Sequence, residues 1–166
     1  METALGSYSF PTQSLEIGSY IGDYLEEKGK SDVAAKFQLN RFVMKLQALE
    51  RTYIDKIFAL CDYYLQGKSK RYSRHLYDIY KLTPMIKFDD NFEKLVKEIR
   101  EHREKMAICP SAKEGVDVAA VIQEFCDNAF YREDYQAITG YFTADFVSYD
   151  DVIRNIRQVA LKGFFS

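Results

Sequence analysis

The sequence predicts a mostly α-helical protein: a single helical domain of about six to seven helices, with at most a short N-terminal strand or a small hairpin. Three observations predict this class. Apolar residues recur at helical spacing along most of the chain, and only residues near 5–10 and 42–46 have a pattern typical of strands. Hydrophobic residues make up 47% of the chain and aromatic residues 15%, which is enough apolar surface to offset the entropy lost on folding.

The first part of the chain has the least regular pattern. Residues 1–15 are expected to form an extended arm or one terminal strand, and the helical domain is expected to cover residues 16–166. Apolar residues at helical spacing predict a helix that begins at Ile17 and ends near Gly29, followed by a short helix that ends at Phe37.

The centre of the chain predicts two helices joined by a short basic loop. Residues 49–66 have an apolar arc of about 160° at 100° per residue, which predicts an amphipathic helix. A second helix is expected from about Tyr72 to Lys81, and the short loop favours antiparallel packing of the two. The side of the first helix opposite its apolar arc carries Arg51, Asp55 and Asp62.

The C-terminal part of the chain predicts four further helices. The first begins with Asp90 and Glu93 as a capping pair, and its charged residues are expected to form a solvated face. Cys109 and Pro110 interrupt the pattern after it, and Ser148 caps the last helix. The expected helical segments are residues 90–106, 118–125, 131–142 and 149–159.

Composition and motifs exclude several classes of function. The net charge of -2 gives no reason to expect general attraction to nucleic acid or to anionic membranes. The sequence contains no phosphate-binding glycine loop, no zinc-binding cluster and no serine-hydrolase motif. No apolar stretch approaches the roughly 20 residues that cross a bilayer, so no membrane association is expected. Three cysteines without paired spacing, and no apolar N-terminal run, favour the cytoplasm.

Ionisable residues at the borders of the two central apolar arcs form the first candidate site. Lys56 lies just outside the arc of its helix, where its stem packs on the core and its ammonium reaches an edge or groove. On the next helix, Arg74 and His75 lie four and three residues before Asp78, so all three side chains can meet on one flank. Either these residues form a local ion pair and a core histidine, with Lys56 extended to solvent, or the set binds phosphate.

The loop between these two helices adds positive charge. It carries Lys68, Lys70 and Arg71, which suit phosphate recognition. The same loop could clamp nucleic acid, which predicts weak binding that decreases steeply with salt. The candidate nucleotide-binding or phosphate-binding residues are Lys56, Lys70, Arg71, Arg74 and His75.

Two segments of the chain resemble blocks of a known family. Residues 49–60 (LERTYIDKIFAL) and 72–80 (YSRHLYDIY) resemble the third and fourth conserved blocks of the AbiEii/AbiGii-type nucleotidyltransferases, toxins of type IV toxin-antitoxin and abortive-infection systems. The resemblance continues through residues 109–111 and 130–131 into the last helix. It therefore covers nearly the whole chain, although only the two blocks are specific.

The resemblance implies a nucleotidyltransferase with a divided site. In that family an N-terminal core binds Mg²⁺ and a nucleoside triphosphate through a Gly-Gly/Ser turn and an Asp-x-Asp pair. The helical half supplies a Lys that contacts the triphosphate and an Asp in the fourth block, which match Lys56 and Asp78 and make these two the candidate catalytic residues. Tyr72, Arg74 and His75 stand where many relatives have Arg, Lys and Asp, so the roles of those family residues do not carry over.

The resemblance also implies what this chain lacks. Residues 6–10 resemble the tail of the core's last strand, so we expect the metal-binding half to be missing, no metal to be bound and no nucleotide to be transferred by this chain alone. The implied partners are an antitoxin protein and, for the full-length enzyme, an RNA acceptor such as transfer RNA. The alternative is a non-catalytic helical interaction module that binds an antitoxin or another protein.

Overall fold

The computed structural model describes residues 11–139 and 145–165, which are mostly helical with a two-stranded sheet, so the predicted fold class is confirmed. The chain divides into two compact units, Met1–Ala48 and Leu49–Ser166. The first unit extends beyond the predicted arm of residues 1–15 and ends at Ala48, because a hairpin and two short helices form their own set of contacts. No described helix has both the length and the apolar character needed to cross a membrane.

The unit Met1–Ala48 contains a β hairpin with two short helices in its connection. The strand predicted at residues 42–46 is confirmed, and the strand predicted near residues 5–10 lies outside the described residues. The two strands pair antiparallel. The elements are β1 (Thr12–Ile17), α1 (Tyr20–Glu27), α2 (Ser31–Lys36) and β2 (Phe42–Gln47).

Ile17 belongs to strand β1, which corrects the predicted start of the first helix. Ser19 has an extended backbone, and its hydroxyl accepts a hydrogen bond from the Gly22 amide at 3.0 Å, so the helix begins at Tyr20. An apolar residue at the end of a strand can fit a helical spacing by chance, which explains the error.

The sheet of this unit is amphipathic. Cross-strand partners share a face, and the pairs Leu15–Met44 and Ile17–Phe42 lie on the same face as Leu46. Leu15 and Met44 are each 43% exposed, and Phe42 is 58% exposed. The buried residues within the described part of this unit are Gly22 and Ala34. The unit therefore has an apolar surface and almost no core of its own.

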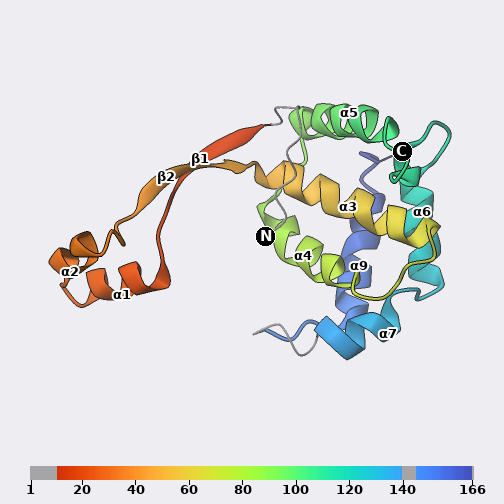
Figure 1. Cartoon of the computed structure of the whole chain (residues 1–166). Coiled ribbons are helices and arrows are strands. Elements are labelled where there is room, and N and C mark those ends of the chain that lie inside the picture. The colour runs from red at the N-terminus through yellow and green to blue at the C-terminus, as the bar shows by residue number, and fades with distance from the viewer. Residues whose placement is uncertain (1–10, 140–144, 166) are drawn as a thin grey trace. The chain divides into compact units, whose positions relative to one another are not determined.

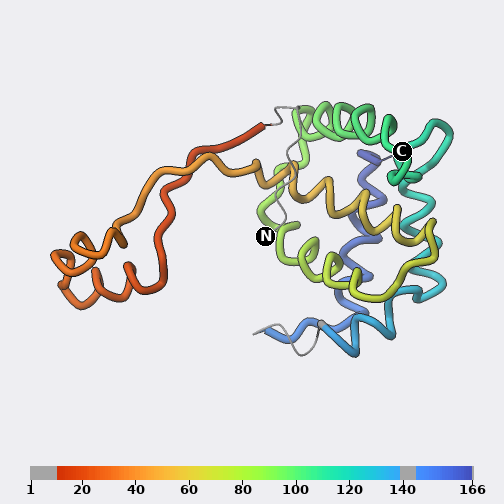
Figure 2. The backbone as a smooth tube through the Cα atoms, viewed as in Figure 1, coloured from red at the N-terminus to blue at the C-terminus, as the bar shows by residue number. Residues whose placement is uncertain are grey.

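The unit Leu49–Ser166 is a bundle of helices around a central helix, α3 (Figure 1). Its elements are α3 (Leu49–Leu65), α4 (Arg74–Leu82), η1 (Thr83–Met85), α5 (Asp90–Glu104), η2 (Pro110–Ala112), α6 (Val118–Asp127), α7 (Arg132–Asp134), η3 (Tyr135–Thr139) and α9 (Tyr149–Ala160). Helix α3 contacts α4, α5 and α6, and α9 packs on α4 and α6. The backbone reverses direction between α3 and α4 (Figure 2), so the expected antiparallel pair is present.

Helix α3 is buried over most of its circumference. Its predicted apolar arc supplies the centre of the core, where the fully buried side chains are Tyr53, Ile54, Ile57, Phe58, Leu60 and Cys61. These residues are spread over a wide arc of α3, so they can pack against more than one neighbouring helix. The rest of the surface of α3 is its charged side.

The charged side of α3 is covered by α5 and by the turn at Ser111. The Asp62 carboxylate is 3% exposed and accepts hydrogen bonds from Ser111 N at 2.8 Å, Ser111 Oγ at 2.7 Å and Arg103 Nη2 at 2.6 Å. Arg103 also lies 3.2 Å from Asp55, which pairs with Arg51 at 2.6 Å. The prediction that the charges of α5 form only a solvated face is therefore wrong for Arg103, because this residue neutralises two carboxylates of α3.

Helix caps follow the sequence closely. Ser148 caps α9 as predicted. Asp89, one residue before the predicted Asp90, caps α5, since its extended backbone lets its carboxylate accept from the amides of Asn91 and Phe92. Two adjacent aspartates made the choice ambiguous from spacing alone.

The helix expected at residues 131–142 is divided into two short turns. Helix α7 is followed by the π-helical turn η3, and residues 140–142 lie outside the described part of the chain. Asp134 of α7 accepts hydrogen bonds from the amides of Arg71 at 2.8 Å and Ser73 at 3.2 Å. This carboxylate therefore holds the loop that leads into α4.

Replacing Asp62 by Ala should lower the free energy of unfolding by about 3–5 kcal/mol, because Ser111 would lose its acceptor and the largely buried Arg103 would keep only its longer contact to Asp55. Urea unfolding followed by circular dichroism measures the change. The control is Asp127→Ala: Asp127 pairs with Arg157 at 2.6 Å but is 64% exposed, so its loss should cost less than about 1 kcal/mol. Equal losses in the two variants would contradict the role of Asp62.

Candidate functional site

Lys56 of α3 and Asp78 of α4 form an ion pair between the two helices. Lys56 Nζ lies 2.6 Å from Asp78 Oδ2, and the two side chains are 23% and 37% exposed. Each residue is next in sequence to a fully buried isoleucine, Ile57 or Ile79. The helix backbones therefore hold this pair at the border of the core, partly open to solvent.

His75 joins this pair and Arg74 does not. His75 Nδ1 lies 3.7 Å from Asp78 Oδ2, longer than a hydrogen bond, and the imidazole is 15% exposed. This nitrogen is buried and makes no hydrogen bond within the described residues. Arg74 is exposed and forms no ion pair with any described residue. Of the three side chains that can meet on this flank, the structure brings His75 and Asp78 together and leaves Arg74 apart, because Asp78 turns toward α3 and Lys56.

The charged form of Asp78 is stabilised by its neighbours. Burial alone would raise the pKa of Asp78. His75, the hydrogen bond from Lys56 and the Lys56 charge outweigh burial, so the pKa lies below its ordinary value of 3.8. Asp78 is thus an anion held between two basic groups.

Stacked aromatic rings flank the pair. The rings of Tyr63 on α3 and Tyr72 before α4 lie 3.6 Å apart at an angle of 18°. The Tyr63 ring is also nearly parallel to His75, at 8° and 6.2 Å between ring centres. Sequence reasoning missed this stack, because it depends on how the loop returns Tyr72 to the side of α3 and no local pattern signals that.

The basic loop lies apart from the Lys56–Asp78 pair in its contacts. Lys68 Nζ donates to Gln66 Oε1 at 2.6 Å. Lys70 and Arg71 line a cavity of about 350 Å³ together with Glu133 and Asp134. Two carboxylates thus balance two cations there, so the loop is no uniformly basic surface. The predicted set divides into Lys56 and His75 beside Asp78, Arg74 in solvent, and Lys70 with Arg71 at this cavity.

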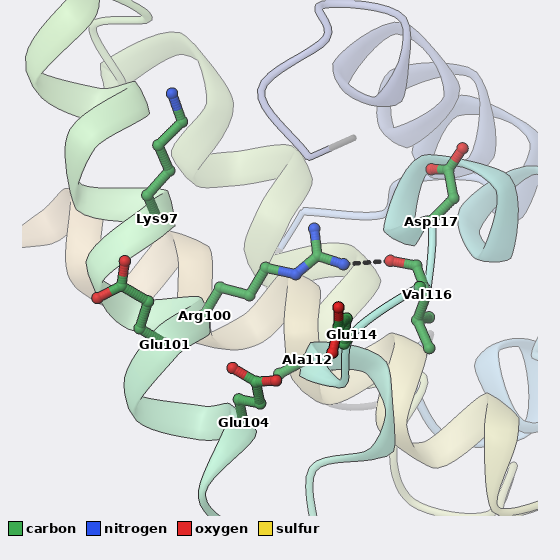
Figure 3. A pocket seen from close by; sticks show the side chains of 9 residues that line it. Lys97, Arg100, Glu101, Glu104, Ala112, Glu114, Val116 and Asp117 are labelled. Atoms are coloured by element: carbon green, nitrogen blue, oxygen red, sulfur yellow. Dashed lines mark hydrogen bonds between the residues drawn. The ribbon is translucent and has the colours of Figure 1, made fainter.

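A larger cavity, of about 730 Å³, lies between α5 and the segment that precedes α6 (Figure 3). Arg100 crosses it and donates a hydrogen bond to the Val116 carbonyl. Its charged lining mixes Lys97 with carboxylates on both sides. None of the predicted site residues lines this cavity, and its mixed charge indicates no particular ligand.

Comparison with known protein families identifies the chain's relatives. A family model described as nucleotidyl transferase AbiEii toxin, type IV TA system, matches residues 1–155 of 166. The chain belongs to the AbiEii family. The resemblance inferred from residues 49–60 and 72–80 is therefore confirmed. No curated protein and no solved structure matches the chain.

The described residues of this AbiEii-family chain do not fit the Mg²⁺ that the resemblance implies. Within residues 11–139 and 145–165 no group of three or more His, Cys, Asp or Glu side chains is placed to hold a metal ion. The Asp78 carboxylate is already paired with Lys56, and the sequence contains no Asp-x-Asp motif. The arrangement of Lys56, Asp78 and His75 suits charge neutralisation, not metal binding.

Protonation of Asp78 should weaken the contact between α3 and α4 in this AbiEii-family chain. The pKa of Asp78 in the folded chain is below its ordinary value of 3.8. The ionised carboxylate therefore stabilises the fold fully above about pH 4, and this stabilisation is lost as the pH falls through the pKa of the folded chain. Asp78→Asn should cost about 0.5–1 kcal/mol at about pH 7, a small value because Asp78 is 37% exposed.

Urea unfolding of both proteins between about pH 7 and about pH 2 measures this effect. The difference between wild type and Asp78→Asn should close below about pH 4. Asp145→Asn is the control, since Asp145 pairs with Lys81 but is 76% exposed. A difference that stays constant over the whole range would count against the ionised pair.

Proposed function

We propose that the unit Leu49–Ser166 binds the triphosphate of a nucleotide substrate in an AbiEii-type nucleotidyltransferase. In this proposal Lys56 contacts a phosphate and Asp78 positions Lys56. The observation that carries it is the 2.6 Å ion pair between Lys56 and Asp78 at a partly open edge between α3 and α4. Both residues fall in the segments that resemble the third and fourth blocks of the family.

Side-chain chemistry supports this division of roles. Lys56 has a flexible four-carbon stem, so its ammonium can turn from the Asp78 carboxylate toward a phosphate oxygen. Asp78 itself repels phosphate, which leaves it a positioning role. His75, 3.7 Å from Asp78, is a second basic group beside that carboxylate.

The metal-dependent chemistry of transfer belongs, in this proposal, to residues outside those described. Mg²⁺ and the nucleoside triphosphate would be held together by an Asp-x-Asp pair of the kind that the resemblance implies, and this sequence contains no such pair. We therefore expect no nucleotidyl transfer by this chain alone. An RNA acceptor such as transfer RNA, and a cytoplasmic location, are parts of the same proposal.

Lys56→Met should weaken binding of nucleoside triphosphates by about ten-fold, because a hydrogen bond to a charged group contributes roughly 1.5–3 kcal/mol. Methionine keeps the length and apolar character of the lysine stem, so the fold should survive. Dissociation constants come from NMR titrations with ATP, GTP, CTP and UTP in turn. Each titration is repeated without Mg²⁺, where the effect of the substitution should persist.

The matched control is Lys97→Met. Lys97 pairs with Glu93 at 2.6 Å on the surface of α5 and is 69% exposed, so its removal should leave nucleotide affinity unchanged. Wild-type affinity of Lys56→Met for all four nucleotides would remove Lys56 from the site.

A second candidate function is protein binding through the sheet of the unit Met1–Ala48. The apolar face that includes Leu15, Phe42 and Met44 favours it, because a contiguous exposed apolar surface is typical of interaction sites. In this alternative the chain acts as a non-catalytic module. The antitoxin of the type IV system is then the expected partner.

Phe42→Asp should weaken binding of the purified antitoxin to the immobilised chain by about ten-fold or more, since it places a charge on the apolar face. Biolayer interferometry measures the dissociation constant. Val43→Asp is the control: Val43 is 71% exposed and faces the opposite side of the same strand. If the two variants bind alike, the apolar face is not the interface.

A further inference from the structure

A cavity of about 300 Å³ lies between the turn η3 and the start of α9. It uses none of the residues assigned above to triphosphate binding. Its aromatic lining consists of Tyr135, Phe146 and Tyr149, and its polar lining includes Arg132, Gln136 and Asp150. Aromatic walls with a few polar groups are typical of sites for small planar ligands.

The inner wall of this cavity consists of two buried aromatic rings. Tyr135 and Tyr149 are 3% and 4% exposed, and their rings meet edge to face at 5.7 Å and 61°. The Tyr135 hydroxyl donates to the Val147 carbonyl at 3.0 Å, which ties the segment before α9 to η3. A ligand would therefore meet a surface that is already formed, and little ordering entropy would be lost on binding.

The charges at the cavity are balanced. The Arg132 guanidinium lies 4.6 Å over the Tyr149 ring and 2.9 Å from Asp150. Because this guanidinium already occupies the face of Tyr149, the aromatic wall is not available as a cage for a cationic ligand. The adjacent Asp150 carboxylate disfavours a simple anion. A neutral planar ring fits best.

Two side chains at the cavity are available to such a ring. Phe146 is 78% exposed. Gln136 is exposed and makes no hydrogen bond with the residues that the structure describes, so its amide can both donate and accept. Arg132, Tyr135 and Gln136 are spaced so that they lie on one side of the helical segment. The segment continues into a π-helical turn, a conformation that occurs frequently at functional sites.

We propose that this cavity binds a nucleobase, stacked on the Phe146 ring and hydrogen-bonded at its edge by the Gln136 amide. Bases stack on aromatic side chains whatever their sequence, and carboxamides form paired hydrogen bonds with base edges. The base can belong to a free nucleotide or to a single strand of RNA. The two sources share the same contacts, and the experiment separates them.

Phe146→Ala should weaken binding of adenosine, guanosine, cytidine and uridine alike, by about ten-fold each, since stacking on one side chain contributes about that much. Gln136→Ala should instead reduce the difference in affinity among the four nucleosides. Ligand-observed NMR titrations measure these dissociation constants. Because nucleosides carry no phosphate, this assay can fail while the triphosphate assay succeeds, and the reverse.

The control variant is Phe37→Ala, which removes a phenylalanine that is 63% exposed in the other unit and should leave affinity unchanged. The base belongs to an RNA strand if single-stranded oligoadenylate binds more tightly than adenosine and Phe146→Ala weakens both affinities by the same factor. Equal affinities assign it to a free nucleotide. Absence of nucleoside binding, or wild-type affinity in Phe146→Ala, overturns the proposal.

Discussion

Burial of the Asp62 carboxylate is the constraint on which the helical unit depends. A carboxylate that is 3% exposed is stable only while its charge and its lone pairs are satisfied. Its partners come from Arg103 at the end of α5 and from Ser111 in the turn that follows. Helix α3, helix α5 and this turn must therefore assemble together, and the side of α3 that faces α5 is fixed.

One side of α3 forms the charge pairs with α5, and helix α4 packs against another part of the surface of α3. There the two helices are held by apolar contacts, and the Lys56–Asp78 pair lies where those contacts end. An ion pair in that position is partly solvated and has room to rearrange. The contrast with Asp62 is physical: Asp62 has no freedom to exchange partners, whereas Asp78 shares its environment with Lys56, His75 and water.

Local features of this fold were predictable from the sequence, and pairwise features were not. The periodicity of residues 49–66 and the Ser148 cap depend on neighbours within a few positions, and both predictions are confirmed. Lys56 and Asp78 could be selected because each lies at the edge of the apolar arc of its helix. Their direct contact, in preference to a contact between Arg74 and Asp78, depends on the register between two helices, which spacing within one helix does not contain.

Partners distant in sequence account for most of what was missed. Arg103 is 41 residues from Asp62, so its charge could not be distinguished from its solvated neighbours on α5. The Tyr63–Tyr72 stack and the cavity beside η3 join segments that are closer in sequence, but both depend on the path of a loop, which no local pattern signals. The roles of Lys56 and Asp78 in a reaction stay predictions, since family membership identifies the class of protein and not the act of each side chain.

Asp134 ties the loop of the α3–α4 hairpin to a part of the chain that is distant in sequence. A pair of antiparallel helices joined by a short loop is local in sequence and can form early, because little loop entropy opposes it. Yet the amides of Arg71 and Ser73 in that loop bond to a carboxylate 63 and 61 residues further along the chain. The register of α4, and with it the position of Asp78 beside Lys56, therefore depends on α7 being packed against this loop.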